Sequence, residues 1–172
     1  TAYNYNYIGE NNLKNIYNQW DLFLNLSLSE GNSHYAFTIN YPNEEIHKLY
    51  KPVGLHTHNA FHIRPHFHAA GFKEETCSCI TLDKFAELNK IDRIDFLKID
   101  TEGNELDVLL GASNLLSNSI IKAGQFEYGG TWNERGLRFI DAFNLLSTLK
   151  YEIYDVINSS LVKVTREFRN DW

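Results

Sequence analysis

The sequence predicts an α/β fold in which helices cover both faces of a mainly parallel sheet. From Ile94 onward, buried strand patterns alternate with amphipathic helix patterns, which is the element order of parallel sheets. The run 94–99 is apolar except for Asp95 and Lys98, which is typical of a strand covered on both faces. In such sheets ligands bind beyond the carboxyl ends of the strands, so functional residues are expected at that edge.

Size, charge and cysteine content limit the possible classes of protein. The 172 residues fit one domain with a buried core, with 43% hydrophobic and 22% charged residues. The net charge of −6 disfavours binding to nucleic acid or to an anionic membrane. No apolar run approaches the roughly 20 residues of a membrane-spanning helix. Cys77 and Cys79 stand too close for a comfortable disulfide, which predicts a reducing, cytoplasmic-type compartment.

The N-terminal part is predicted to hold one helix and two strands. Residues 8–17 have the spacing of a short helix. Residues 21–28 have the pattern of a buried strand, which a turn at Ser29 to Asn32 closes. Residues 34–39 form the second predicted strand.

The segment at about 41–75 differs in amino-acid composition from the rest of the chain and is predicted to be a His-rich loop or insertion. It holds all three prolines, and five of the seven histidines lie from His56 to His68. Long runs without apolar periodicity are typical of segments that carry function or mobility.

The remaining elements alternate along the chain. Thr81 is placed to cap a helix, Gly129 and Gly130 end a strand, and Asn158 with Ser159 forms a turn. The predicted elements are, in order, a strand over 76–80, a helix over 82–88, a strand over 94–99, a helix from Asn104 through the leucines of 106–116, a strand over 120–128, a helix over 134–149, and strands over 152–156 and 161–165.

Carboxylates follow two neighbouring predicted strands. Asp100 and Glu102 come at the end of one strand and Glu127 at the end of the next, so the three are expected to converge on one edge. Each also has a structural interpretation. Asp100, Glu102 and Glu105 are placed to cap a helix and to favour its dipole, and Glu127 is placed to pair with Lys98.

The histidines and aromatic residues leave alternatives open. The His-x-His pairs ending at His58 and His68 put two imidazoles on one face of an extended segment, which suits a divalent metal or a general base. They are equally suited to packing against nearby phenylalanines. Tyr128 and Trp132 are candidates for stacking on a sugar ring, with core packing as the alternative.

Three stretches of the sequence together form a specific pattern. They are Thr81-Leu82-Asp83, the run from Ile94 to Glu105 with its Lys98-Ile99-Asp100-Thr101-Glu102-Gly103-Asn104-Glu105 core, and Val108-Leu109-Leu110-Gly111-Ala112. This pattern resembles the FkbM family of S-adenosylmethionine-dependent methyltransferases, which act on hydroxyl groups of sugars and polyketides. The segment from Asn25 to Gly31 resembles the family's third strand, and Phe126-Glu127-Tyr128 its fifth. The resemblance runs from about Asn12 to Val156 and implies a Rossmann-like class I methyltransferase sheet.

One part of the family pattern is missing from this sequence. Family members begin with a Gly-rich strand-to-helix loop for the cofactor and a second strand that ends in an acid, whereas here no G-x-G motif precedes a helix. Without this N-terminal βαβ unit, the strand 21–28 is expected to lack its neighbour beside 94–99. Either roughly 50 residues precede Thr1 in a larger polypeptide, which we favour, or the sheet is rebuilt.

The resemblance implies an O-methyltransferase for a small-molecule or glycan acceptor, such as a sugar or another polyhydroxylated compound. The implied roles are catalysis for Asp100, Glu102 and His66, cofactor binding for Ser27 and Asp100, and substrate binding for His68, Glu127, Tyr128 and Trp132. S-adenosyl-L-methionine is the implied cofactor, with a divalent metal as an open addition. The alternatives are a non-catalytic binding domain that uses its His-rich segment, and a fragment that folds only with another segment or chain.

Overall fold

A computed structural model describes residues 23–27, 35–37, 45–53 and 60–165, with side chains from His47 onward except at 66, 67, 77 and 78. The predicted helix over 8–17 lies outside the described residues. The chain divides into two compact units, one over Leu22–Leu137 and one that includes the described residues from Arg138. The single predicted domain therefore stays a prediction.

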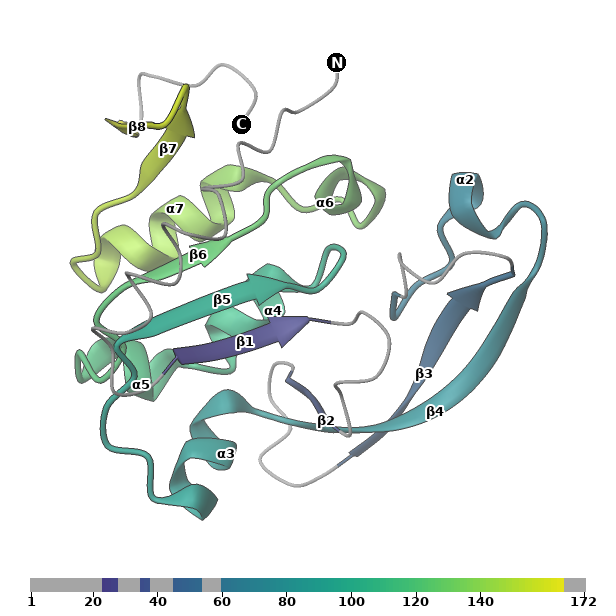
Figure 1. The fold of residues 1–172 in the computed structure, drawn as a ribbon, viewed down its shortest axis with the longest axis horizontal. Helices are drawn as coiled ribbons and strands as arrows, with labels where there is room; N and C mark the ends of the chain where they lie inside the picture. The colour runs from purple at the N-terminus through teal and green to yellow at the C-terminus, as the bar shows by residue number, and fades with distance from the viewer. Residues whose placement is uncertain (1–22, 28–34, 38–44, 54–59, 166–172) are drawn as a thin grey trace. The chain divides into compact units, whose positions relative to one another are not determined.

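Three parallel strands form the sheet that carries the candidate site. They lie in the order β1 (Phe23–Ser27), β5 (Phe96–Asp100) and β6 (Gly124–Phe126), so β5 is central (Figure 1). In register, Phe23 pairs with Phe96 and Ser27 with Asp100. The expected gap beside this strand is therefore wrong for the described residues, because β1 pairs directly with β5 and satisfies its backbone groups.

The central strand forms as predicted, but its burial differs between the two faces. Leu97 and Ile99 share one face and are each 2% exposed, whereas Phe96, Lys98 and Asp100 on the other face are half-buried. The predicted strand over 120–128 is shorter than expected. It begins as an isolated bridge between Ile121 and Ile94 and continues as the three residues of β6. At Gly124 the two strands come so close that a Cβ would lie 2.8 Å from the carbonyl oxygen of Leu97. A parallel sheet is thus confirmed, and the wider Rossmann-like arrangement stays a prediction.

Helix α3 (Leu82–Asn89) begins as predicted, because Thr81 Oγ1 accepts a hydrogen bond from the backbone N–H of Lys84 at 3.1 Å. The predicted helix from Asn104 onward is instead two helices, α4 (Glu105–Leu110) and α5 (Ser113–Ser117). α4 packs against β5 and α5 against α3. Buried leucines, isoleucines and valines of these elements, each worth about 1.5–3 kcal/mol of burial, form the core of this unit.

The His-rich segment is more regular than predicted. β3 (Glu45–Pro52) and β4 (Phe72–Ile80) form an antiparallel ribbon, β2 (Tyr35–Phe37) pairs with β4 in parallel, and α2 (Pro65–His68) lies between β3 and β4 in sequence. The expectation of an irregular loop is therefore wrong over these ranges. Cross-strand ion pairs explain the missing apolar pattern, since Lys48 pairs with Glu74 and Lys51 with Glu75, each at 2.7 Å.

The predicted helix over 134–149 begins later than expected, as α7 (Phe139–Thr148), and the short helix α6 (Gly130–Glu134) before it was not predicted. α6 ends before Gly136, whose φ is +70°, and α7 begins where Asp141 Oδ2 accepts a hydrogen bond from the N–H of Arg138. In the second unit, β7 (Tyr154–Ile157) and β8 (Ser160–Lys163) form the predicted hairpin. Its turn has positive φ at both central residues, Asn158 and Ser159.

Within the described part of the chain, no helix combines the length and apolarity needed to cross a membrane.

Candidate active site

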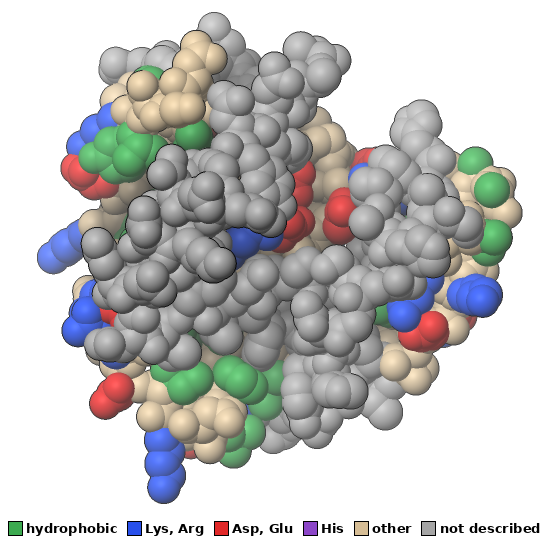
Figure 2. All heavy atoms as spheres, viewed as in Figure 1, with side chains coloured by type: hydrophobic (Ala, Val, Ile, Leu, Met, Phe, Trp, Pro, Cys, Tyr) green, Lys and Arg blue, Asp and Glu red, His purple; other side chains and the backbone are tan. Residues whose placement is uncertain are grey.

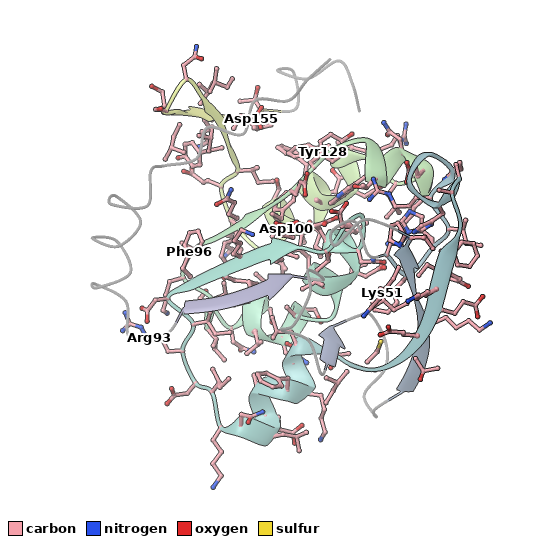
Figure 3. The ribbon with its side chains drawn as sticks, turned by 45° about the vertical axis from the view of Figure 1, so that its right-hand side comes forward. Lys51, Arg93, Phe96, Asp100, Tyr128 and Asp155 are labelled. Carbon is pink, nitrogen blue, oxygen red and sulfur yellow. The ribbon has the colours of Figure 1, made fainter. Side chains whose placement is uncertain are left out.

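The candidate site lies at the carboxyl end of the parallel strands. Figure 3 labels Phe96 and Asp100 at the two ends of β5, and Tyr128 after β6 on the Asp100 side. Helix α4 starts directly beyond the turn that follows β5, at residues 101–104. Side chains of this turn and of the segment after β6 therefore meet at the edge where the sequence predicts ligand binding.

Glu105 organises the turn from the inside. Its side chain is fully buried, and its carboxylate accepts hydrogen bonds from the N–H of Thr101 at 2.8 Å and from the N–H of Gly103 at 3.1 Å. Burial raises the pKa of Glu105, and the hydrogen bonds from its neighbours partly offset that rise. Glu105 therefore shapes the turn and does not face solvent.

Gly103 lets the turn pass close to α6. Its φ is +101°, and a Cβ at this position would lie 3.0 Å from the carbonyl oxygen of Thr131. Arg135 holds the turn from the same side, since its Nη1 donates to the carbonyl of Gly103 and pairs with Asp107, each at 2.7 Å. The turn is thus held on both sides by charged groups.

Glu102 is the residue of this turn that reaches the His-rich segment. Its φ of +54° is left-handed, and its Oε2 lies 2.6 Å from Arg64 Nη1. Arg64 Nε also lies 3.0 Å from Glu134 Oε2, and His62 Nε2 lies 3.4 Å from the same oxygen. We call Arg64, Glu102, Glu134 and His62 the Arg64 cluster. The face in Figure 2 shows acidic side chains in the region where Figure 1 draws the end of β5 and α6.

The Arg64 cluster is largely shielded from water. The Arg64 side chain is 5% exposed, and the carboxylate side chains of Glu102 and Glu134 are 20% and 24% exposed. Burial, the largest cause, lowers the pKa of His62, although the hydrogen bond to Glu134 acts in the opposite direction. The imidazole of His62 is therefore neutral near pH 7.

His68 supports Arg64 and is not turned toward solvent. Its Nδ1 accepts a hydrogen bond from the backbone N–H of Arg64 at 2.7 Å, and its ring packs near those of Tyr50 and Phe72. Burial lowers the pKa of His68, so the ring is neutral. Because Nδ1 accepts, the ring proton of this neutral form is on Nε2.

Asp100 does not bond the turn that follows it. Its Oδ2 pairs with Lys98 Nζ at 2.9 Å, and its side chain is 39% exposed. Glu105 bonds the turn instead, through N–H groups that precede α4. Helix α4 has no side-chain hydrogen bond at its N-cap, Asn104, so the capping interpretation is not confirmed for Asp100 or for Glu105. Ser27 is the register partner of Asp100, and the structure describes its backbone only.

Glu127 and the two aromatic residues follow β6. The N–H of Glu127 donates to the carbonyl of Ile99 at 3.2 Å, and burial raises the pKa of its carboxyl group. Trp132 is fully buried, donates from Nε1 to the carbonyl of Glu127, and meets Tyr128 edge-on at a centroid distance of 5.2 Å. Packing therefore accounts for Trp132, whereas Tyr128 is half-buried.

The structure brings some predicted site residues together and not others. Asp100, Glu102, Glu127 and Tyr128 share the carboxyl edge, and Glu102 also contacts the His-rich segment. The side chain of His66 and the residues His56 and His58 lie outside what the structure describes. Among the described residues, no group of three or more His, Cys, Asp and Glu side chains is arranged to hold a metal ion.

Sequence reasoning missed Arg64 and Glu134. Each belongs to a segment without a recognisable motif, and they meet across a separation of 70 residues. Their one local signal is indirect, since Pro65 at the start of α2 fixes where the backbone of Arg64 must turn.

Comparison with known proteins gives one match. A family model described as the methyltransferase FkbM domain matches residues 3–155, a range that includes the parallel sheet, the turn after β5 and the Arg64 cluster. Neither the curated proteins nor the solved structures yielded a match. Because the matched range covers most of the 172 residues, the chain belongs to the FkbM family of methyltransferases.

Proposed function

We propose that this protein is an S-adenosylmethionine-dependent O-methyltransferase whose acceptor is a sugar or another polyhydroxylated molecule. The observation that carries the proposal is the acidic turn after β5, which lies at the carboxyl end of a parallel sheet inside the matched family range. Ligands of open α/β sheets bind at this edge. Half-exposed Asp100 and half-buried Glu127 and Tyr128 give the edge both acceptor groups and an aromatic face.

The donor set at this edge suits the cofactor. S-adenosylmethionine carries an ammonium group, a sulfonium group and a ribose diol, all of which a carboxylate can accept or balance. Asp100 offers such a carboxylate. At Gly129 and Gly130, no described residue beyond the adjoining backbone lies within 4 Å of where a Cβ would stand. Asp100 and Ser27 are the residues proposed to hold the cofactor. When bound, the cofactor supplies an electrophilic methyl group on sulfur.

The chain's own residues would orient the acceptor and manage its proton. Methyl transfer joins the acceptor oxygen to the methyl carbon and breaks the bond from that carbon to sulfur, and the hydroxyl proton must leave. Asp100 is the proposed proton acceptor, with His66 as the alternative that the sequence pattern supports. Glu102 is proposed to orient the acceptor, and Glu127 and Tyr128 to contact it. The principal contribution of such a site is positioning.

His68 is assigned a different role from the one its sequence position implies. Its Nδ1 is engaged with the N–H of Arg64, and its ring is buried. Those contacts support a role in placing α2 rather than in binding the acceptor directly.

Titration calorimetry with S-adenosylhomocysteine tests the proposal first, followed by transfer of labelled methyl groups to a panel of mono- and oligosaccharides. The expected results are one binding site per chain and label on at least one acceptor. Both measurements should use the full natural chain, with any residues that precede Thr1. Absence of binding would refute the methyltransferase hypothesis and favour a non-catalytic binding domain.

The second candidate function is that non-catalytic binding domain. The direct pairing of β1 with β5 favours it, since the two strands satisfy each other's backbone groups without a cofactor-binding loop between them.

A further inference from the structure

We propose that Arg64 is a positioning residue of the methyl-transfer site, which holds Glu102 in place from within the His-rich segment. The inference rests on the proposed function, because it assigns a role at the same site. It concerns a residue that lies outside the family-like motifs and 38 positions before its partner.

The contacts of Arg64 carry the inference. Its guanidinium joins two carboxylates from different elements, Glu102 in the turn after β5 and Glu134 in α6. The planar fork of arginine suits such two-sided binding, and a lysine ammonium does not reproduce it. Because the side chain is only 5% exposed, its positive charge is largely removed from water, and the two carboxylates compensate for the lost solvation.

The backbone of Arg64 is itself fixed. Its N–H donates to His68 Nδ1, and its carbonyl accepts from the N–H of His68 at 2.9 Å. These two bonds close the single turn of α2 and leave the Arg64 side chain to extend toward Glu102. His68 thus fixes the backbone of Arg64, and the Arg64 side chain in turn binds the carboxylate of Glu102.

The turn after β5 needs such a support. Glu105 and Arg135 fix its backbone, through the N–H and the carbonyl of Gly103. Neither bonds the carboxylate of Glu102, which Arg64 reaches at 2.6 Å. Arg64 therefore adds a hold on the turn through the side chain of Glu102, and it helps to set where this carboxylate points relative to the proposed acceptor.

Hydrogen exchange of the purified full chain tests the hold of Arg64 on the turn. The variants are R64M, R64K and E134Q, with R93M as the matched control, because Arg93 also pairs with an aspartate but its side chain is 58% exposed. We expect R64M to raise amide exchange at residues 101–104 about tenfold, as breaking a buried ion pair does. R64K should give a smaller rise, and R93M none. Exchange in R64M equal to that in R93M would overturn the proposal.

A kinetic double-mutant cycle supplies a readout that a purely structural role would not move. It uses the saccharide acceptor identified by the labelled-methyl assay and compares R64M, E102Q and the double variant. We expect R64M to lower kcat at least about tenfold with the KM for S-adenosylmethionine unchanged, and to add less than twofold in the E102Q background. Independent, additive effects would overturn the proposal.

The two measurements separate this proposal from the proposed function. If the unmodified protein transfers no methyl group, the proposed function fails, and the exchange data still decide whether Arg64 holds the turn. If R64M does not fold, R64K and E102Q decide. E102Q removes the charged partner while keeping Arg64, and it should raise exchange at residues 101–104. No rise in either variant would refute the role of Arg64.

Discussion

Asp83 Oδ1 accepts a hydrogen bond of 3.0 Å from the backbone N–H of Leu115, 32 residues further along the chain. Asp83 Oδ2 accepts a second bond from the N–H of Asn114 at 2.9 Å. The Asp83 carboxylate therefore satisfies two N–H groups in the first turn of α5 while its own backbone belongs to α3. The Thr-Leu-Asp part of the family-like pattern therefore has a structural role in this fold, because it joins the start of α3 to the start of α5.

Asp83→Ala should destabilise the protein by about 1–2 kcal/mol, because two N–H groups at the start of α5 lose their acceptor. Urea unfolding followed by circular dichroism measures the change. Asp92→Ala is the control, since Asp92 is exposed and lies in the segment between α3 and β5. A loss no larger than that of Asp92→Ala would show that α5 does not depend on this bond.

Gly103→Ala should destabilise the fold by about 1–3 kcal/mol, because the φ of +101° disfavours any side chain and the new Cβ would lie 3.0 Å from the Thr131 oxygen. Gly129→Ala is the matched control. Its φ of −166° is ordinary extended backbone, and the described part of the chain places no atom within 4 Å of the added Cβ. Equal midpoints of thermal unfolding for the two variants would contradict the close approach of the turn to α6.

Glu105→Gln should cost about 2 kcal/mol of unfolding free energy. The amide keeps one acceptor oxygen but places an NH₂ group against the backbone N–H donors of Thr101 and Gly103. Chemical denaturation measures the loss. Glu87→Gln is the control, because the side chain of Glu87 is 69% exposed in its pair with Lys84. If Glu105→Gln were as mild as the control, Glu105 would not organise the turn.

Local signals account for what the sequence predicted correctly. Thr81 caps α3 through a bond to a residue three positions away, and the apolar run around Leu97 is enough by itself to predict a strand there. The predicted strand over 76–80 is the second half of β4. The rest of the ribbon, β3 and the first half of β4, was missed because pairs such as Lys48 with Glu74 stabilise it across strands. Arg64 was missed for the same reason. Tertiary structure brings its partners to it, and the neighbouring Pro65 indicates only where the backbone turns.

Acidification should weaken folding through His68. Burial and the charges of Arg64 and a protonated His62 lower its pKa, while Glu134 and the backbone of Tyr50 act against them. The folded state therefore binds fewer protons than the unfolded state, whose imidazole titrates at about 6.5, so stability falls as pH drops below that value.

His68→Asn removes this titration and keeps an oxygen near the position of Nδ1 to accept from the N–H of Arg64. The dependence of the unfolding free energy on pH, measured from pH 7.5 downward, should be shallower in the variant than in the unmodified protein. Identical slopes would mean that His68 is not the group that titrates. The comparison uses slopes, so a uniform loss of stability in the variant does not affect it.

Asp100→Asn should weaken methyl transfer far more than loss of its ion pair does. Asn keeps the size of the side chain and removes the charge that the proposed cofactor and proton-accepting roles require. Lys98→Gln removes only the partner at 2.9 Å, and because both side chains are about one-third exposed, that pair contributes at most about 1 kcal/mol. We therefore expect kcat/KM to fall at least about a hundredfold in Asp100→Asn and less than about fivefold in Lys98→Gln, measured by labelled methyl transfer. Similar losses in both variants would identify Asp100 as a structural partner of Lys98 and move the proposed proton acceptor to His66.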